Sequence, residues 1–346
     1  MKAMVYHDYG TPDVLKCEEV EMPSPKENQV LLKVHAAAVN PLDCGLMKGQ
    51  PYFMRFLFGF PKPKVTHPGR DVAGEVEAVG PGVMHFKPGD EVFGVCTAGG
   101  WLNKCDGAFA EYACTLEAGL AMKPDNMTFE QAAAAPIAAL TALQGLRDKG
   151  QIKPGQKVLI NGAAGGVGTF AVQIAKAFGA EVTGVCSTRN VEMVRGIGAD
   201  HVIDYTQMDF TKGSEKYDLI FDLVGNHSFA ELRRVLVPKG IFVGAGVVGA
   251  PKTIAGMLGG LASTIVVSLF VSQRYATFVA KANTDDLNAI RELMASGKVT
   301  PVVDRAFDLS ETAGAMRYQD QGHARGKVVI TVPVDRQTSA AYGARR

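Results

Sequence analysis

A short apolar strand, a glycine-rich turn and an amphipathic helix follow one another directly in this chain, and this succession constrains the fold most. The strand is expected at Val158 to Ile160, and Gly179 stands where a left-handed helix C-cap belongs. Small residues let the backbone of such a turn approach a pyrophosphate, and the helix N-terminus directs unpaired N–H groups at it. We therefore predict a dinucleotide site, with a purely structural strand–helix turn as the alternative. The predicted contacts follow the pattern [Gly/Ala]-x-Gly-x-x-Gly: Ala163, Gly165, Gly166, Val167 and Gly168.

Strands and helices continue to alternate after this turn, which predicts an α/β fold with a parallel sheet covered by helices on both faces. A capping box at Thr128 opens an alanine-rich helix expected to reach about Arg147, and a last strand is expected near 277–282. Residues 1–127 are β-rich, with apolar runs between Gly and Pro turns, and residues 302–332 return to β character. We predict a β-rich catalytic domain from residues 1–127 with 284–346, and a dinucleotide-binding domain from 128–283.

The composition limits the partners of the protein. The 346 residues include 36 Lys and Arg against 35 Asp and Glu, so the formal net charge is +1 and no global field attracts nucleic acid or an anionic membrane. The six cysteines stand singly, without any Cys-x-x-Cys, as reduced thiols do. The first ten residues lack the apolar run of a signal peptide. We expect a cytoplasmic protein with a small-molecule partner and no nucleic-acid role.

The segment from Thr253 to Gln273 carries no charged residue. Its 21 residues could span a bilayer by length alone. Three glycines interrupt it, and it lies between two segments that resemble strands of a soluble sheet. A buried helix, a pocket lid or a subunit contact is the favoured interpretation, and we predict no membrane span.

The residues about twenty positions beyond the glycine turn select the cofactor. An acid at the end of the second strand holds the ribose 2′-hydroxyl of NADH, whereas hydroxyls and a cation accept the 2′-phosphate of NADPH. That strand ends without Asp or Glu, at Ser187, Thr188 and Arg189. These residues can donate hydrogen bonds to a phosphate, so NADPH is the predicted cofactor, with an ordinary solvated turn as the alternative.

Further motifs lie in order along nearly the whole chain. They include Ala38-Val-Asn-Pro-Leu-Asp43, Gly69-Arg-Asp-Val-Ala-Gly-Glu-Val76, Ala135-Pro-Ile-Ala-Ala-Leu-Thr-Ala142, Gly198-Ala-Asp-His-Val-Ile-Asp-Tyr205 and Gly326-Lys-Val-Val-Ile330. With them the chain resembles the medium-chain dehydrogenase/reductase superfamily, and more narrowly its zinc-independent quinone oxidoreductase branch. The resemblance implies a GroES-like catalytic domain plus a Rossmann domain, chemistry in the cleft between them, and usually a homodimer.

Carried over position by position, the resemblance implies particular site residues. Asn40 and Thr141 would lie near the nicotinamide, and Tyr205 near the adenosine phosphate. Backbone contacts to the cofactor would come from Val224, Gly225, Gly244, Ala245, Gly246 and Val247.

The zinc ligands of metal-dependent relatives do not transfer to this chain. Those relatives use a Cys, a His beside an acid that follows a glycine, and a further Cys or acid. The matching positions are Asn40, Arg70-Asp71 after Gly69, and Ile137. Since zinc strongly prefers Cys and His, we predict no metal.

Without a Lewis acid, a saturated ketone is a hard acceptor because the developing alkoxide needs stabilisation. A quinone or an α,β-unsaturated carbonyl gives a delocalised anion instead. We therefore hypothesise hydride transfer from NADPH to such an acceptor, with Asn40, Thr141 or water bonded to its oxygen. Asp43 and Tyr52 are candidate proton-transfer groups. A structural role for Asp43, together with Arg70 and Asp71, is the favoured alternative.

Two other functions stay open. A zinc-free alcohol dehydrogenase or ketoreductase of the same superfamily would prefer a saturated ketone. A non-catalytic NADPH-binding protein would bind the cofactor without turnover.

Overall fold

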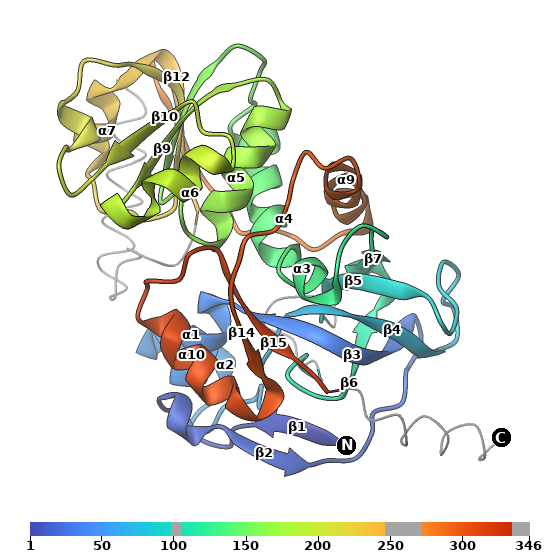
Figure 1. Cartoon of the computed structure of the whole chain (residues 1–346). Helices are drawn as coiled ribbons and strands as arrows, with labels where there is room; N and C mark the ends of the chain where they lie inside the picture. Colours follow the sequence, from blue (N-terminus) through green and yellow to red (C-terminus); the bar gives the residue numbers. More distant parts are fainter. Residues whose placement is uncertain (98–105, 246–271, 334–346) are drawn as a thin grey trace.

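Two large β-sheets organise the chain in the computed structural model, which describes residues 1–97, 106–245 and 272–333 (Figure 1). One is a parallel sheet of six strands, and the other is a mixed sheet of seven strands. Strands β1 (Lys2–Val5) and β2 (Lys16–Glu19) form a separate antiparallel pair. This arrangement confirms the predicted α/β fold, with a parallel-sheet lobe and a β-rich lobe.

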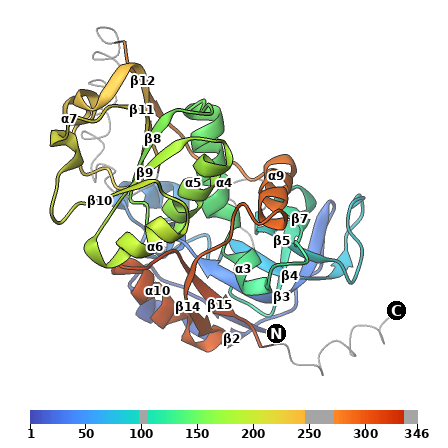
Figure 2. The ribbon, with the colours of Figure 1, turned by 45° about the horizontal axis from the view of Figure 1, so that its top comes forward.

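The parallel sheet has the strand order β10-β9-β8-β11-β12-β13, in which the chain starts in the middle and reverses direction between β8 and β11. This is the 3-2-1-4-5-6 order of a Rossmann fold. Its elements, drawn in the upper lobe of Figure 2, are β8 (Lys157–Asn161), α5 (Gly166–Ala177), β9 (Glu181–Cys186), α6 (Val191–Gly196), β10 (His201–Asp204), β11 (Tyr217–Asp222), α7 (Phe229–Arg234), β12 (Leu236–Gly244) and β13 (Arg274–Thr277).

Both faces of this sheet are buried, as its apolar strands predict. Successive side chains of a strand point to opposite faces. Val158 and Ile160 of β8 therefore join one core with Ile174 of α5. Leu159 lies between them in sequence and joins the opposite core with Leu232 of α7. The helices thus cover both sides of the sheet.

The mixed sheet is centred on the long strand β3. Strand β15 pairs antiparallel with β3, with Val328 opposite Val39, so the end of the described chain returns to the N-terminal sheet. Helix α10 covers it through Ala315 and Met316. The elements of this lobe are β3 (Gln29–Val39), α1 (Pro41–Lys48), α2 (Arg55–Phe58), β4 (Asp71–Val79), β5 (Glu91–Val95), β6 (Tyr112–Leu116), β7 (Leu120–Met122), β14 (Val303–Asp308), α10 (Thr312–Asp320) and β15 (Lys327–Thr331).

The predicted continuous helix from Thr128 to Arg147 is wrong. The structure divides it into α3 (Phe129–Ala133) and α4 (Pro136–Gln144), followed by a π-helical turn at Gly145–Lys149. Pro136 has no N–H to donate and its ring would clash with the preceding turn, so it begins a new helix at N1 instead of continuing the first. The capping box at Thr128 is present as predicted.

The last strand of the parallel sheet also lies earlier than predicted, at Arg274–Thr277 instead of 277–282. Strand β13 pairs with β12 up to Gly244, the last residue of β12, which lies opposite Thr277. The next residues turn to α4, where Gln144 accepts a hydrogen bond from the Lys281 N–H and donates one to the Lys281 carbonyl.

Helix α9 (Thr284–Ala295) lies between the two sheets. Thr284 Oγ1 donates to the Ala118 carbonyl, and Asn126 Nδ2 donates to the Met294 carbonyl, both in hydrogen bonds of 3.2 Å. At its other side, Asp286 accepts a bond from Gln144 and forms an ion pair with Arg147 of the parallel-sheet lobe. The predicted domain boundary near residue 284 therefore stays a prediction.

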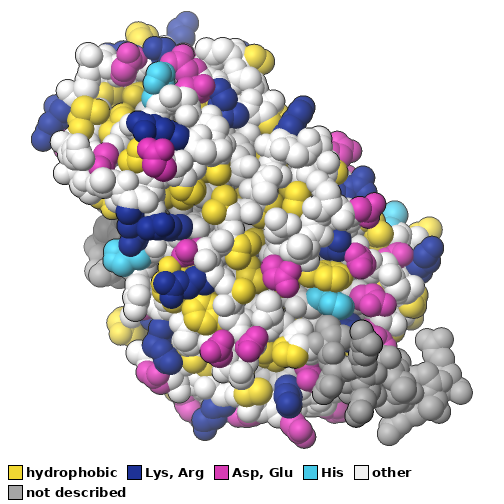
Figure 3. Space-filling view, in the orientation of Figure 1, with side chains coloured by type: hydrophobic (Ala, Val, Ile, Leu, Met, Phe, Trp, Pro, Cys, Tyr) yellow, Lys and Arg dark blue, Asp and Glu magenta, His cyan; other side chains and the backbone are white. Residues whose placement is uncertain are grey.

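No helix within residues 1–97, 106–245 and 272–333 has the length and apolarity to cross a membrane. The uncharged segment 253–273 lies outside the described residues except at its last two positions. Charges of both signs are interspersed on the face drawn in Figure 3, in keeping with the near-zero net charge.

Candidate active site

The glycine-rich turn between β8 and α5 is fixed by close backbone approach. A Cβ at Gly168 would lie 2.1 Å from the Gly162 carbonyl oxygen, and Gly162 itself has a φ of +88°. The N–H groups of Gly162 and Ala163 donate to the Val185 carbonyl at 3.2 and 3.0 Å, which ties the turn to β9. The first N–H groups of α5 have no acceptor within the helix. Unpaired N–H groups at a helix N-terminus can bind an anion, as the predicted pyrophosphate contact requires.

The point where the strand order reverses lies beside this turn. Asn161, at the end of β8, donates a buried 2.9 Å hydrogen bond to Asp222 Oδ1 at the end of β11. The same oxygen accepts bonds from the N–H groups of Val224 and Gly225, at 3.0 and 3.1 Å. A Cβ at Gly162 would lie 2.9 Å from Val224 Cγ2, so the segment after β11 flanks the glycine turn. Ligands of open α/β sheets bind at this reversal.

The predicted adenosine end of the site, at Ser187, Thr188 and Arg189, lies beside an acid that the sequence analysis missed, Asp204. Thr188 Oγ1 donates to Asp204 Oδ2 at 2.6 Å. This bond and those from Thr206 hold the pKa of Asp204 below its ordinary value. Arg189 Nη2 donates to the His323 carbonyl of the β-rich lobe at 2.9 Å. A cation and a carboxylate therefore flank the end of β9 that is predicted to hold the ribose 2′-position, and Tyr205 follows Asp204 as an exposed side chain.

Three strands of the β-rich lobe meet at a buried polar cluster, which we call the Lys327 cluster: Asn40, Asp71 and Lys327. Asn40 follows the end of β3, Asp71 begins β4 and Lys327 begins β15. Lys327 Nζ donates to Asn40 Oδ1 at 2.7 Å and to Asp71 Oδ2 at 3.0 Å, and Asn40 Nδ2 donates to Asp71 Oδ2 at 3.0 Å. The side chains of Lys327 and Asp71 are 4% and 0% exposed.

The Lys327 cluster contacts both the glycine turn and helix α4. The Gly326 N–H donates to the Ala164 carbonyl at 2.9 Å, and Gly326 pairs with Gly165 in a β-bridge. Asp71 Oδ1 accepts a 2.9 Å bond from the N–H of Ile137 in the first turn of α4. One turn later, Thr141 Oγ1 donates to the Ile137 carbonyl at 2.7 Å. Ile137 thus links Thr141 to the cluster that contains Asn40, the other residue predicted near the nicotinamide.

Asp43 is connected to this cluster through Asn40 and caps the N-terminus of helix α1. Its carboxylate accepts hydrogen bonds from the N–H groups of Asn40 (2.9 Å) and Gly69 (3.1 Å), which completes the capping box of α1. Burial raises the pKa of Asp43 to about 6, although these two bonds and nearby Arg70 act against the rise. Arg70 is buried and donates to the Cys96 carbonyl. These contacts support the structural alternative for Asp43.

Tyr52 lies on the surface, 65% exposed, with the Arg55 guanidinium 4.9 Å from its ring centre. Its role as a proton donor stays a prediction.

Gly244 ends β12, and the N–H of Ala245 donates to the Asp222 carbonyl at 3.0 Å, which places both residues beside the strand-order reversal. The predicted contacts Gly246 and Val247 lie outside the described residues.

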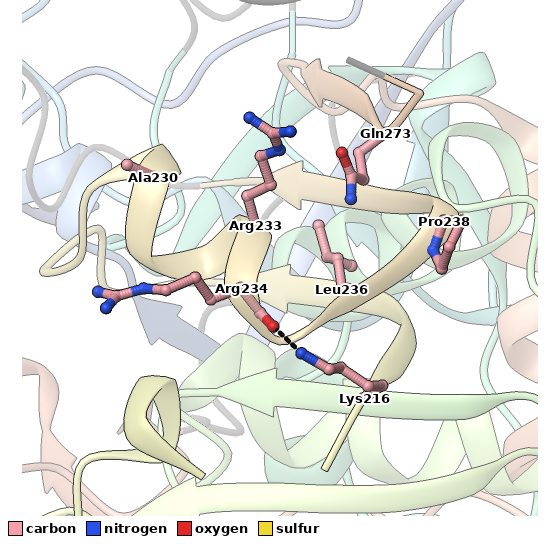
Figure 4. Close-up of a pocket in the computed structure, with 7 residues that line it drawn as sticks. All are labelled: Lys216, Ala230, Arg233, Arg234, Leu236, Pro238 and Gln273. Carbon is pink, nitrogen blue, oxygen red and sulfur yellow. Dashed lines mark hydrogen bonds between the residues drawn. The ribbon is translucent and has the colours of Figure 1, made fainter. Parts of the chain in front are cut away.

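A cavity of about 470 Å³ lies at the opposite edge of the parallel sheet from the glycine turn (Figure 4). Its lining residues precede or begin strands β11, β12 and β13, whereas the glycine turn follows the end of β8. Lys216 Nζ donates to the Arg234 carbonyl there. This cavity is therefore separate from the cofactor site. Its lining is Lys216, Ala230, Arg233, Arg234, Leu236, Pro238 and Gln273.

Comparison with known proteins agrees with this geometry. Residues 26–125 match the alcohol dehydrogenase GroES-like domain, and residues 197–330 match the zinc-binding dehydrogenase family. The 2-methylene-furan-3-one reductase of Solanum lycopersicum is 38% identical over 95% of this chain and 79% of its own length, and the chloroplastic NADPH-dependent alkenal/one oxidoreductase of Arabidopsis thaliana gives the same values. The structure of the Coxiella burnetii quinone oxidoreductase superposes with a TM-score of 0.81 at 31% identity, covering 96% of this chain and 99% of that one.

The chain belongs to the quinone oxidoreductase-like branch of the medium-chain dehydrogenase/reductase superfamily. It is an NAD(P)H-dependent oxidoreductase of that type.

In this superfamily member, the positions that match zinc ligands belong to the Lys327 cluster and its surroundings. Asn40 and Asp71 bind the Lys327 ammonium, and Ile137 contributes its N–H to Asp71. Within the described residues, no group of three or more His, Cys, Asp and Glu side chains could hold a metal ion. An amide, one carboxylate and a competing ammonium do not fit zinc, which prefers Cys and His.

Two site residues escaped the sequence analysis, although each left a signal. Lys327 is a charged residue at the start of the apolar strand Val328–Ile330, where a buried strand ordinarily has none. Asp204 ends the strand next to β9, and carboxyl ends of neighbouring parallel strands meet at one edge. Attention to the third strand as well as the second would have found it.

We expect the substitution Gly168→Ala to abolish tight cofactor binding, because the added methyl group would overlap the Gly162 carbonyl and displace the turn. The dissociation constant for NADPH, measured by fluorescence titration, should rise about tenfold or more. The free energy of unfolding should fall by about 1–3 kcal/mol.

Gly196→Ala is the matched control, because a Cβ at Gly196 meets no atom within 4 Å. It should leave the dissociation constant unchanged. Equal binding by both variants would contradict a cofactor role for the turn.

We expect Asp43 to make folding pH-dependent. Between its unfolded pKa of 3.8 and its folded pKa of about 6, the folded state keeps a proton that the unfolded state has lost. The free energy of unfolding of the wild type, minus that of Asp43→Asn, should therefore fall by on the order of 2–3 kcal/mol as the pH rises from 4 to 7, and stay level above that. Urea unfolding at four pH values measures this difference. A difference that rises with pH would show that the Asp43 pKa is lowered instead.

Proposed function

We propose that the protein transfers a hydride from NADPH to a quinone or an α,β-unsaturated carbonyl compound without a metal ion. The observation that carries this proposal is the Lys327 cluster. Among the positions that match the zinc ligands and the adjoining acid, Asn40 and Asp71 bond each other and an ammonium group, and Arg70 donates to the Cys96 carbonyl. No Lewis acid is then available to stabilise a localised alkoxide, so the acceptor must delocalise the negative charge itself.

The hydrogen-bond donors near the cluster suit such an acceptor. Asn40 Nδ2 carries one proton in the 3.0 Å bond to Asp71, and its second proton has only a long 3.4 Å contact to the Ala38 carbonyl. That second proton can be donated to the oxygen of an enolate or a hydroquinone anion. The Thr141 hydroxyl, which now bonds Ile137, is the second candidate. Bound NADPH supplies the hydride, and a proton from water completes the reaction.

The relatives support the acceptor class. The names of the tomato and Arabidopsis proteins specify a methylene-furanone and an alkenal or alkenone, and that of the Coxiella protein specifies a quinone. The Arabidopsis name also specifies NADPH. Arg189 is the cation that favours NADPH in this chain.

The same proposal includes four further points: the homodimer, the cytoplasmic location, the domain boundaries and the individual roles of the site residues. Light scattering of the purified protein tests the dimer, and a mass equal to one chain would remove it.

We expect the enzyme to oxidise NADPH rapidly with but-3-en-2-one or a naphthoquinone and slowly with butan-2-one. Butenone and butanone differ only in the conjugated double bond, so their comparison isolates charge delocalisation. The ratio of kcat/KM should be roughly two orders of magnitude or more, the size of one lost oxyanion interaction. Preference for butanone would favour a ketoreductase. Tight NADPH binding without turnover of any acceptor would favour a non-catalytic binding protein.

We expect Arg189→Ala to raise the KM for NADPH by about tenfold or more, the value of a hydrogen bond between charged groups, and to leave the KM for NADH nearly unchanged. Asp204→Asn should change the NADPH:NADH preference in the opposite direction, because it removes a negative charge beside Thr188. Steady-state kinetics with both cofactors measures the ratio. Arg195→Ala is the control, since Arg195 is an exposed cation paired with Glu192. An unchanged ratio in Arg189→Ala would end the assignment of the phosphate site.

A further inference from the structure

The Lys327 ammonium is fully buried and fully bonded. Its protons have three acceptors: the Val39 carbonyl (3.3 Å), Asn40 Oδ1 (2.7 Å) and Asp71 Oδ2 (3.0 Å). Asp71 is equally saturated, because its Oδ1 accepts from the Ile137 N–H. Removing either charge alone would leave the other buried without its partner, which is costly.

Such a pair is a poor source of stability. The desolvation of two buried charges offsets most of their attraction, and apolar replacements of similar volume are often neutral or stabilising. What a saturated ion pair does provide is a unique geometry for the groups bonded to it. The group in question here is the Asn40 side chain.

The two charges determine which way the Asn40 amide points. A lysine ammonium can only donate, so the amide oxygen must face Lys327. An ionised carboxylate can only accept, so the amide nitrogen must face Asp71. A flip of the amide would place two donors together and two acceptors together. The second Nδ2 proton is therefore held in one direction, in which its acceptor in the structure is the Ala38 carbonyl at 3.4 Å; in the proposed function it is donated to the acceptor instead.

The stem of Lys327 connects this orientation to the cofactor turn. A Cβ at Gly166, the first residue of α5, would lie 3.1 Å from Lys327 Cδ. The backbone just before Lys327 pairs with the turn through the bond between Gly326 and Ala164. These contacts therefore fix the position of the Asn40 donor relative to the turn that is proposed to bind the cofactor.

We propose that Lys327 is a positioning residue for hydride transfer, which orients the Asn40 amide relative to the cofactor bound at the glycine turn. This inference rests on the proposed function. Lys327 contacts neither reactant in it; the residue acts through Asn40, with Asp71 as its partner.

The test uses Lys327→Met, Asn40→Ala and the double variant of the full-length protein. Methionine keeps the unbranched stem against Gly166 and removes the ammonium. The rate of hydride transfer to the best acceptor, measured in single turnovers, should fall about 10- to 100-fold in each single variant. The double variant should be no slower than the slower single variant, because both changes remove the same donor. The dissociation constant for NADPH should stay within about threefold of the wild type, since the glycine turn is intact.

Lys123→Met is the control for the loss of a buried ammonium group and its hydrogen bonds. Lys123 is also a buried lysine of the β-rich lobe, bonded to the Pro124 and Met127 carbonyls and paired with Glu91, whose side chain is largely exposed. The Lys123→Met variant should have a lower melting temperature and an unchanged hydride-transfer rate. Multiplicative rate losses in the Lys327/Asn40 double variant would overturn the positioning role, as would a wild-type rate in Lys327→Met.

If Lys327→Met does not fold, the hydride-transfer rate can be measured instead in the charge-neutral variant Lys327→Met/Asp71→Asn. It removes both charges, so it should fold, yet its Asn40 amide is free to turn and the hydride-transfer rate should stay low. Recovery of the rate would mean that only charge balance matters, against the proposal. Failure of the wild type to turn over any quinone or enone would instead sink the proposed function, so the two failures are distinguishable.

Discussion

The buried ion pair between Lys327 and Asp71 is the interaction on which the site depends. Asp71 accepts hydrogen bonds from the Lys327 ammonium, the Asn40 amide and the Ile137 N–H. These donors come from β15, from the residue after β3 and from α4, which are distant in sequence. Because a carboxylate accepts from all of them at once, it fixes the relative positions of two strands of the mixed sheet and of the helix that carries Thr141.

The two halves of the site are built differently. The cofactor half is local: one strand, one turn and one helix supply the backbone donors, and Gly162 and Gly168 permit their close approach. The proposed substrate half is assembled from residues up to 287 positions apart, the separation of Asn40 and Lys327. The contact between Gly326 and Ala164 joins the halves, so strand β15 serves both.

This difference explains how much the sequence could predict. The glycine turn, the capped helix after it and the alternation of strands depend on spacing within short windows, and the structure confirms them. Pro136 divided the alanine-rich helix because a steric clash with the preceding turn outweighs alanine's helix propensity. Lys327 and Asp204 each left only a local hint, a charge at one end of an apolar strand, whereas their bonding partners depend on strand pairing across the sheet, which no local pattern encodes. Asn40 was found through the family resemblance, but its bonding partners were not.

The Lys327 cluster also relates this chain to the metal-dependent members of its superfamily. A zinc ion at this place would carry two positive charges and an open coordination position for a substrate oxygen. The Lys327 ammonium carries one charge, neutralised by Asp71, and each of its protons already has an acceptor. It can orient a neighbouring amide but cannot polarise a carbonyl as a Lewis acid does. A site of this kind gains its reactivity from the electronic structure of the acceptor, and the protein's part is to hold the cofactor, the acceptor and one amide proton in register.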